Sequence, residues 1–483
     1  MSASFNVLSE GWIPVIDLEN KRKKLGILDT LKNAHRLKAI SDASAMVEYS
    51  LYRFLSVFLM DALRPKDKET LEDLLEEGSF DPESIDDYIT LCENEGVRFD
   101  LFEKERPFLQ TPYSAVWDKS IKPAAELDYT LPRGNNHTHY DHRNGESCAL
   151  QYDAAARLLL PAQWFCTAGA QGYPSNVSAS PPYYTVVRGR NLFETLVYSL
   201  SVTNRINIPF DDPPVLWRNT EPVEPKKEVT KTSWLFGMLF PARRIVLVPR
   251  DGMVSEVYLC QGMNYTSKET WDDPFVTYRY SKEGRAPWRP NQEKAVWRNL
   301  NDLVDVKGKK APYMLRQYFE LDKEAENASV SLYGVQTNQG SYLGMLHFDL
   351  DIPVRLAQDE DHIRCLEHCI KAVENLAGAL RRSFAGIPEI PAGIVSQAVQ
   401  EYYDLCEQKF WIFIRNSLAA ENADLLDAYQ AWCDYVIRTV KAVRERTTSN
   451  LRLNGHALAE AAKKEKEIAI TVKKLREANV NGE

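Results

Sequence analysis

Residues 358–384 read QDEDHIRCLEHCIKAVENLAGALRRSF, and the character of the chain changes at this stretch. Apolar side chains recur in it at intervals of three and four residues, at Ile363, Leu366, Ile370, Val373, Ala377 and Leu380. That spacing places them on one stripe of a helix. The stretch therefore predicts a long amphipathic helix that packs against other helices.

Three more helical stretches follow, near residues 394–419, 422–445 and 455–478. Prolines punctuate the first connection, and Asn422 is the expected N-cap of the third helix. Short links between long amphipathic helices favour antiparallel neighbours. Residues 355–483 are therefore predicted to form a C-terminal four-helix bundle.

The chain before this region has a mixed pattern. Short β-rich runs, such as 183–187 and 244–249, alternate with helices and with proline-containing loops that cannot continue a strand interior. Residues 1–354 are predicted to form a mixed α/β domain, which makes the whole chain α+β with a helical bundle at its C-terminal end.

The totals describe an ordinary globular chain with an acidic balance. Hydrophobic residues make up 44% of the 483 positions, charged residues 26%, and the formal net charge is −9. A freestanding nucleic-acid binder is normally basic, so this charge argues against one. It does not exclude a subunit whose nucleic-acid face is local and whose partners supply most of the phosphate contacts. Eight cysteines are few enough to indicate free thiols in a reducing compartment.

The most apolar run, residues 46–63, contains Glu48, Arg53 and Asp61. Because hydrocarbon would penalise these charges, the run predicts a buried helix rather than a membrane span. The first residues also lack the basic and apolar segments of a signal peptide. We expect a cytoplasmic protein with no membrane partner.

Familiar catalytic patterns are missing from the sequence. A nucleophile elbow, a His-Glu-x-x-His pair and a Walker-type loop do not occur, and Gly169-Ala-Gln-Gly172 lacks the spacing and the lysine of a phosphate loop. His362, Cys365 and Cys369 share a helix face with core residues, which favours packing over metal binding. These observations favour a binding protein without a cofactor over an enzyme.

One polar segment, Asn135 to His142, has two interpretations. His137, His139, His142 and Asp141 could ligate a metal, since imidazole and carboxylate are normal zinc or iron ligands, and this would indicate a metal-dependent hydrolase. The same amides and imidazoles could instead hydrogen-bond to nucleic acid or to a partner's backbone.

Basic residues gather in four places: Lys21 to Lys24, Arg243 with Arg244, Arg285 to Arg289 (which includes Trp288), and Lys307 to Lys310. Each group could contact phosphate. Solvated surface charge is the default explanation for each of them.

An ordered series of motifs resembles a known family. The motifs are NVLSEGWIPV at 6–15, RPFLQT at 106–111, the segment 135–142, and TVVRGRNL at 185–192. In this order, and with a helical C-terminal region, they are similar to CasA, the large-subunit family of type I-E CRISPR surveillance complexes (Cascade). The resemblance covers nearly the whole chain.

The resemblance implies a non-catalytic subunit. Its partners would be the other Cascade subunits, the guide RNA, double-stranded target DNA and a helicase-nuclease recruited after R-loop formation. The protein would recognise the short protospacer-adjacent motif (PAM) and promote duplex opening, while guide pairing supplies the long sequence specificity. A scaffold with no PAM preference is the remaining alternative.

The resemblance also implies site residues. A glutamine wedge corresponds to Gln339, with Asn338 and Gly340 beside it in a turn between two β-prone runs, although an ordinary hairpin turn has the same signature. A glycine-rich loop corresponds to the region of Gly169 and Gly172, and a lysine finger to Lys268. The docking segment near the guide RNA contributes Asn135, Asn136, His137, His139, Tyr140 and His142.

Overall fold

The computed structural model describes residues 3–131, 148–166, 176–178, 181–267, 271–282, 284–291, 294–322, 324–338, 341–387, 389–451 and 453–481. The chain divides into two compact units. The larger unit contains residues 1–292 and 309–352, and the smaller one contains residues 293–308 and 353–483. The fold is mixed α and β with a helical C-terminal region, as the sequence predicts.

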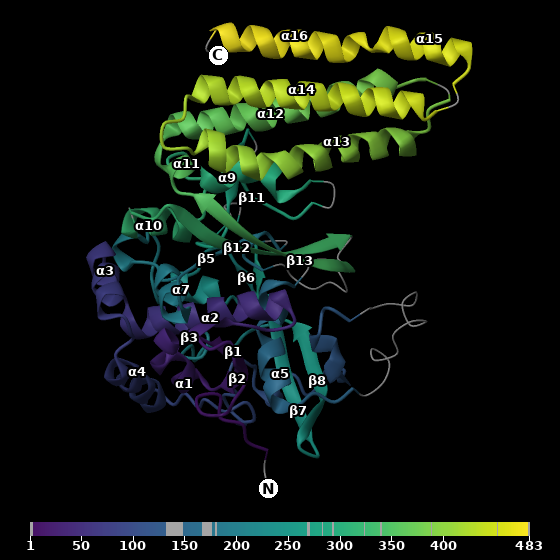
Figure 1. Ribbon diagram of the computed structural model, residues 1–483. Coiled ribbons are helices and arrows are strands. Elements are labelled where there is room, and N and C mark those ends of the chain that lie inside the picture. Colours follow the sequence, from purple (N-terminus) through teal and green to yellow (C-terminus); the bar gives the residue numbers. More distant parts are fainter. Residues whose placement is uncertain are drawn as a thin grey trace. The chain divides into compact units, whose positions relative to one another are not determined.

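The larger unit is built around α2 (Ala45–Leu63), which is buried along almost its whole length (Figure 1). This confirms the prediction of a buried helix, and each of its charges has a partner. Arg53, which is fully buried, donates to Asp273 at 2.7 Å and to the Met238 carbonyl at 2.8 Å. Among the described residues, no helix is both long and apolar enough to cross a membrane.

The other helices of the larger unit are short, and they are α1 (Ile27–Lys32), α3 (Lys68–Glu77), α4 (Pro82–Asn94), α5 (Tyr152–Leu159), α6 (Pro161–Trp164), α7 (Leu192–Tyr198), α8 (Trp234–Met238) and α10 (Tyr313–Leu321).

The larger unit also contains small sheets, of which strands β3, β5 and β12 contact α2. The sheets have the strand orders β2-β1-β3, β13-β12-β5, β4-β8-β7, β10-β11 and β6-β9. Their strands are β1 (Ile13–Asp17), β2 (Arg22–Leu25), β3 (Leu37–Ile40), β4 (Lys122–Pro123), β5 (Tyr184–Arg188), β6 (Glu228–Val229), β7 (Arg243–Arg250), β8 (Met253–Gln261), β9 (Asn264–Tyr265), β10 (Tyr278–Ser281), β11 (Gly284–Pro287), β12 (Asn327–Asn338) and β13 (Ser341–Pro353).

The smaller unit is helical, and α12 (Glu360–Phe384) packs against every other long helix in it. The predicted apolar stripe of α12 is buried, which confirms the amphipathic helix. The remaining helices are α9 (Leu300–Val304), α11 (Arg355–Gln358), α13 (Ala392–Phe413) with a π-helical end at Ile414–Leu418, α14 (Leu425–Ser449), α15 (Gly455–Lys464) and α16 (Lys466–Asn481).

Two details differ from the sequence-based expectation. The stretch predicted as one fourth helix forms two helices, α15 and α16, which are separated at Glu465. The cap of α14 is Asp424 rather than Asn422, because the Asp424 carboxylate accepts hydrogen bonds from the backbone N–H groups of Leu426 and Asp427.

The segment 293–308 joins the helical unit through side chains of its short 3₁₀ turn, Val296–Asn299. Arg298 donates two hydrogen bonds to Glu374 on α12, at 2.7 and 2.9 Å, and lies 3.6 Å from the ring centroid of Tyr403 on α13. Burial opposes ionisation of Glu374, but the hydrogen bonds and charge of Arg298 outweigh it and lower the pKa of that carboxyl. These contacts fix the segment to the helical unit.

Candidate nucleic-acid interface

Most of the site residues expected from the sequence lie outside the described residues. They are Asn135, Asn136, His137, His139, Tyr140, Asp141, His142, Gly169, Gly172, Lys268, Gln339 and Gly340. Asn338 is the last residue of β12, and β13 begins at Ser341. The strands therefore flank positions 339 and 340, and the structure describes how this hairpin is anchored.

The β12–β13 hairpin has a well-defined register at its base. Ser329 Oγ donates to Asp351 at 2.8 Å, Ser331 Oγ donates to Asp349 at 2.6 Å, and the ring of Tyr333 stacks on His347. The partners advance by two residues along β12 and go back by two residues along β13. This is the pattern of an antiparallel pair whose side chains share one face. β12 also pairs with β5, so β13 is the edge strand (Figure 1).

The inner face of the hairpin is fixed to α2 by Tyr333. This side chain is fully buried, and its hydroxyl donates to Glu48 Oε1 at 2.7 Å. The His347 ring covers its other side, with centroids 4.6 Å apart. Burial raises the pKa of the Glu48 carboxyl, while the Tyr333 hydrogen bond and the charge of Arg188 act in the opposite direction. This buried contact joins two elements far apart in sequence.

Arg188, at the end of β5, adds a second connection. Its guanidinium donates to Ser331 Oγ at 3.1 Å and lies 5.5 Å from the ring centroid of Tyr52 on α2. Because Ser331 in turn donates to Asp349, three neighbouring strands are linked by one chain of hydrogen bonds. Such a chain resists slippage of the strands past one another.

The opposite face of β12, which is also buried, carries Gly334, where only glycine fits. A Cβ atom at this position would lie 2.8 Å from ring carbons of Tyr183 and 2.9 Å from Pro290 Cγ. Tyr183 also contacts Trp288 and, on β13, Phe348, with centroid distances of 4.6 and 6.4 Å. Glycine therefore allows an aromatic group to pack directly on the strand backbone.

Burial decreases along the hairpin toward positions 339 and 340. Val330 and Leu332 are buried at its base, whereas Thr337 is exposed and Leu343 is 50% exposed. Closer to these positions, Tyr342 and Met345 of β13 are partly buried against the core, and the Met345 sulfur accepts hydrogen bonds from Ser44 and from the Met46 N–H. The hairpin is therefore held along much of its length.

Sequence reasoning predicted the two strands that flank positions 339 and 340 but not the anchor. Glu48, Tyr183 and Tyr333 carry no local signal, because their partners are distant in the chain. Arg188 lies within the motif TVVRGRNL, which indicates the family but not this contact.

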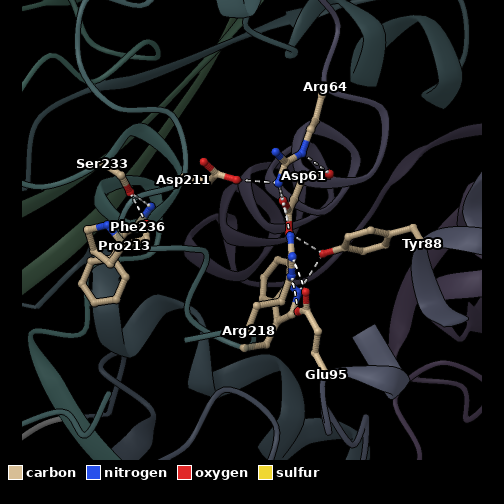
Figure 2. Close-up of polar contacts among 10 residues, drawn as sticks. Asp61, Arg64, Tyr88, Glu95, Asp211, Pro213, Arg218, Ser233 and Phe236 are labelled. Atoms are coloured by element: carbon tan, nitrogen blue, oxygen red, sulfur yellow. Dashed lines mark hydrogen bonds and ion pairs between the residues drawn. The ribbon is translucent and has the colours of Figure 1, made fainter. Parts of the chain in front are cut away.

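A second concentration of charge surrounds Asp61, at the C-terminal end of α2 (Figure 2). The buried Asp61 carboxylate accepts hydrogen bonds from Arg64, Tyr88 and Arg218, and Arg218 also binds Glu95 through two hydrogen bonds of 2.7 and 2.6 Å. The Arg218 hydrogen bonds lower the pKa of Glu95. Because the charges in this network are paired with one another, we assign it to stability rather than to ligand binding.

Most of the basic groups noted in the sequence are also paired. Lys21, Lys23 and Lys24 form ion pairs with carboxylates, and Lys307 is paired with Glu360. Arg243 and Arg244 are buried and donate to backbone carbonyls. In the group near Arg285, Arg285 forms an ion pair with Asp272 at 3.0 Å and Arg289 is exposed, as Arg22 and Lys309 are in their groups.

The metal interpretation rests on residues outside the described part of the chain. Within the part that is described, no group of three His, Cys, Asp or Glu side chains is placed to hold a metal. Cys365 and Cys369 are buried in the helical unit, and His362 lies at the start of α12, where it contacts Asp359 at 3.0 Å.

Comparisons with known proteins agree with one another. The sequence model of the family described as CRISPR-associated protein Cse1 matches residues 6–443. Cse1 from Thermobifida fusca is 20% identical, with a TM-score of 0.79 over 98% of each chain. CasA from Thermus thermophilus is 21% identical, with a TM-score of 0.78 over 97% of this chain and 99% of that one.

A chain of a structure described as a CRISPR RNA-guided surveillance complex is 19% identical, with a TM-score of 0.75 over 99% of this chain and 100% of that one. At these identities the structural likeness establishes the fold. No protein with a curated description matches the chain.

Proposed function

Because the chain belongs to the CRISPR-associated protein Cse1 family, we propose that it is the large subunit of a type I-E CRISPR surveillance complex and recognises the PAM in double-stranded target DNA. In this role it promotes duplex opening and R-loop formation and helps to recruit the helicase-nuclease, without catalysing a reaction itself. It acts in the cytoplasm, together with the guide RNA and the other subunits. The similarity to a chain of a surveillance complex over nearly full length supports this proposal.

The observation that carries the proposal is the anchored β12–β13 hairpin. An element that separates base pairs must keep its shape while DNA resists it, and the Tyr333–Glu48, Arg188–Ser331 and Tyr183–Gly334 contacts hold this base from both faces. Gln339 follows Asn338, the last residue of β12, in the sequence. It can donate and accept in the minor groove, whose degenerate code suits a permissive PAM.

The remaining expected residues complete the interface. Lys268 and the backbone near Gly169 and Gly172 would contact the PAM duplex, and the 135–142 segment would dock the chain beside the guide RNA. Since the chain carries a net charge of −9, it binds DNA weakly when isolated. The partner subunits supply most of the positive field in the assembled complex.

The proposal is tested by duplex binding of the guide-RNA complex with and without this chain, on targets that differ only at the PAM. We expect PAM-dependent binding that appears when the chain is added. Equal binding to every PAM in the presence of the chain would favour the scaffold alternative.

The alternative hypothesis, that the chain is a metal-dependent hydrolase, makes a different prediction. It requires stoichiometric metal in the purified protein and a nuclease activity that is lost in His139→Ala. Our proposal predicts that His139→Ala weakens assembly with the guide-RNA complex instead.

A further inference from the structure

Arg53 lies at the centre of a buried polar network in the larger unit. Its side chain is fully buried in the middle of α2, and its Nε donates to the Met238 carbonyl at 2.8 Å. One of its Nη atoms donates to Asp273 at 2.7 Å and to the Tyr49 hydroxyl at 2.9 Å. The guanidinium thus joins α2 to two other parts of the chain, the end of α8 and the residues before β10.

The chemistry of this arginine favours a positional role. A buried ion pair is weak evidence for stability, because taking two charges out of water often costs as much as their attraction returns. The other Nη atom of Arg53 is buried and has no hydrogen-bond partner among the described residues, which adds to this cost. What the guanidinium supplies is a planar, rigid fork of donors that fixes the positions of its acceptors.

On one side of the network, the acceptor is close in sequence to Lys268. The Tyr278 hydroxyl accepts from the Asp273 backbone N–H at 2.9 Å and donates to the Trp271 carbonyl at 3.0 Å. The Asp273 carboxylate is the group that Arg53 binds. Trp271, three positions after Lys268 in the sequence, is thus tied to α2 through this carboxylate.

On the other side, the Met238 carbonyl connects to the glycine-containing segment. It accepts a second hydrogen bond, at 2.8 Å, from the indole N–H of Trp164. The Trp164 carbonyl accepts from the side-chain amide of Asn176 at 3.0 Å. Gly169 and Gly172 lie between these two residues in the sequence. The described residues on both sides of this segment are therefore connected to the same carbonyl group.

We propose that Arg53 is a positioning residue for recognition of the PAM duplex: it fixes the residues on both sides of the glycine-containing segment relative to the residues that follow Lys268. Groups that bind one ligand together need supporting residues that set their separation, and ordering them in advance lowers the entropic cost of binding. Because Arg53 is fully buried, it acts through these segments and does not touch the DNA. This inference rests on the proposed function, because it takes its ligand from it.

The test variant is Asp273→Asn, which keeps the shape of the side chain and removes the charge that Arg53 binds. Asp61→Asn is the matched control, since Asp61 is also a buried carboxylate of the larger unit and accepts from Arg64 and Arg218 (Figure 2). Each chain is assembled into the guide-RNA complex, and the ratio of its affinities for duplexes with and without a correct PAM is measured. We expect Asp273→Asn to lower this PAM ratio about tenfold, the discrimination that one aligned base contact provides, and Asp61→Asn to leave it unchanged.

A double-mutant cycle shows whether Arg53 acts through Lys268. We expect Lys268→Ala to lower the PAM ratio in the wild-type chain and to have much less effect in Asp273→Asn, where the lysine is no longer held in place. Additive effects of the two substitutions would overturn the inference, as would a wild-type PAM ratio in Asp273→Asn. If Asp273→Asn does not assemble, the double variant Arg53→Met/Asp273→Asn takes its place, because it leaves no unpaired charge in the core.

Hydrogen exchange separates the failure of this inference from the failure of the proposed function. Relative to Asp61→Asn, the amides of residues 164–166, 176–178 and 271–278 should lose protection together in Asp273→Asn. Loss confined to residues 271–278 would overturn the inference, because Arg53 would then not connect the two segments. If the wild-type complex ignores the PAM while the joint loss occurs, the proposed function fails and the positional role of Arg53 stands.

Discussion

Replacing Tyr333 with phenylalanine removes one oxygen atom from the base of the β12–β13 hairpin and keeps the ring. The side chain is fully buried, so its packing against Tyr49, Tyr184 and α2 is retained. The Glu48 carboxyl loses the hydroxyl that donates to it at 2.7 Å. The variant therefore isolates one hydrogen bond between α2 and the hairpin.

The expected cost follows from the surroundings of Glu48. Leaving a buried acceptor without its donor costs about 1–3 kcal/mol. Glu48 keeps a backbone hydrogen bond from Asp42 and the nearby charge of Arg188. We therefore expect the free energy of local opening of the hairpin to fall by about 1–2 kcal/mol at neutral pH.

The cost should depend on pH. Burial raises the folded-state pKa of Glu48 above its ordinary value of 4.5. The stability that Glu48 contributes is therefore fully present below pH 4.5 and is lost as the pH rises through the folded-state pKa. The Tyr333 hydroxyl lowers the pKa of Glu48, so removing this hydroxyl raises that pKa further. The difference between the variant and the wild type should thus be smallest near pH 4.5 and grow with increasing pH.

Hydrogen exchange of the backbone amides in β12 and β13 measures this free energy directly. Tyr198→Phe is the matched control, since Tyr198 is buried in the same unit and its hydroxyl makes no hydrogen bond with the described residues. Glu48→Gln should remove the pH dependence. The reasoning would be refuted if Tyr333→Phe lost no more amide protection than Tyr198→Phe, or if its loss of protection were the same at every pH.

Two further substitutions test the packing. Gly334→Ala should lower the melting temperature and impair duplex opening, because the new Cβ would lie 2.8 Å from the Tyr183 ring, an overpacking that costs about 1–3 kcal/mol. Gly344→Ala is its control in the same hairpin, since the nearest group is 4.0 Å away, and equal melting of the two variants would contradict the argument. Asp61→Asn should destabilise the larger unit to urea by about 1–3 kcal/mol, because it leaves two arginines without a buried anion, whereas the exposed Asp86→Asn should cost less than about 1 kcal/mol. Equal effects of the two aspartate variants would show that the network in Figure 2 contributes no stability.

The sequence was informative where structure follows local periodicity. The spacing of Ile363, Leu366 and Ile370 predicted α12, and the charges within 46–63 predicted a buried helix. The division of the last stretch at Glu465 was missed, because helix propensity continues through that position. Asp424 rather than Asn422 caps α14, a shift of two residues within a polar connection that offers several candidates.

Long-range features could not be predicted in this way. Residues 293–308 belong to the helical unit because Trp297 packs on Phe410 and Arg298 binds Glu374, contacts that no local pattern encodes. The same applies to the site, where the turn at 339–340 was predicted from its flanking strands. Its anchors, Glu48 and Tyr333, are brought together only by the tertiary fold.

The most direct test of the proposed function is strand separation at the first base pairs next to the PAM, followed by the fluorescence of a base analogue in the target duplex. Guide-RNA complexes are assembled with the wild-type chain or with Gln339→Ala, and assembly and duplex binding are measured in parallel. The proposal predicts that Gln339→Ala assembles and binds the duplex, yet opens it markedly more slowly. Wild-type opening by Gln339→Ala would contradict the assignment of the β12–β13 hairpin as the element that separates the strands.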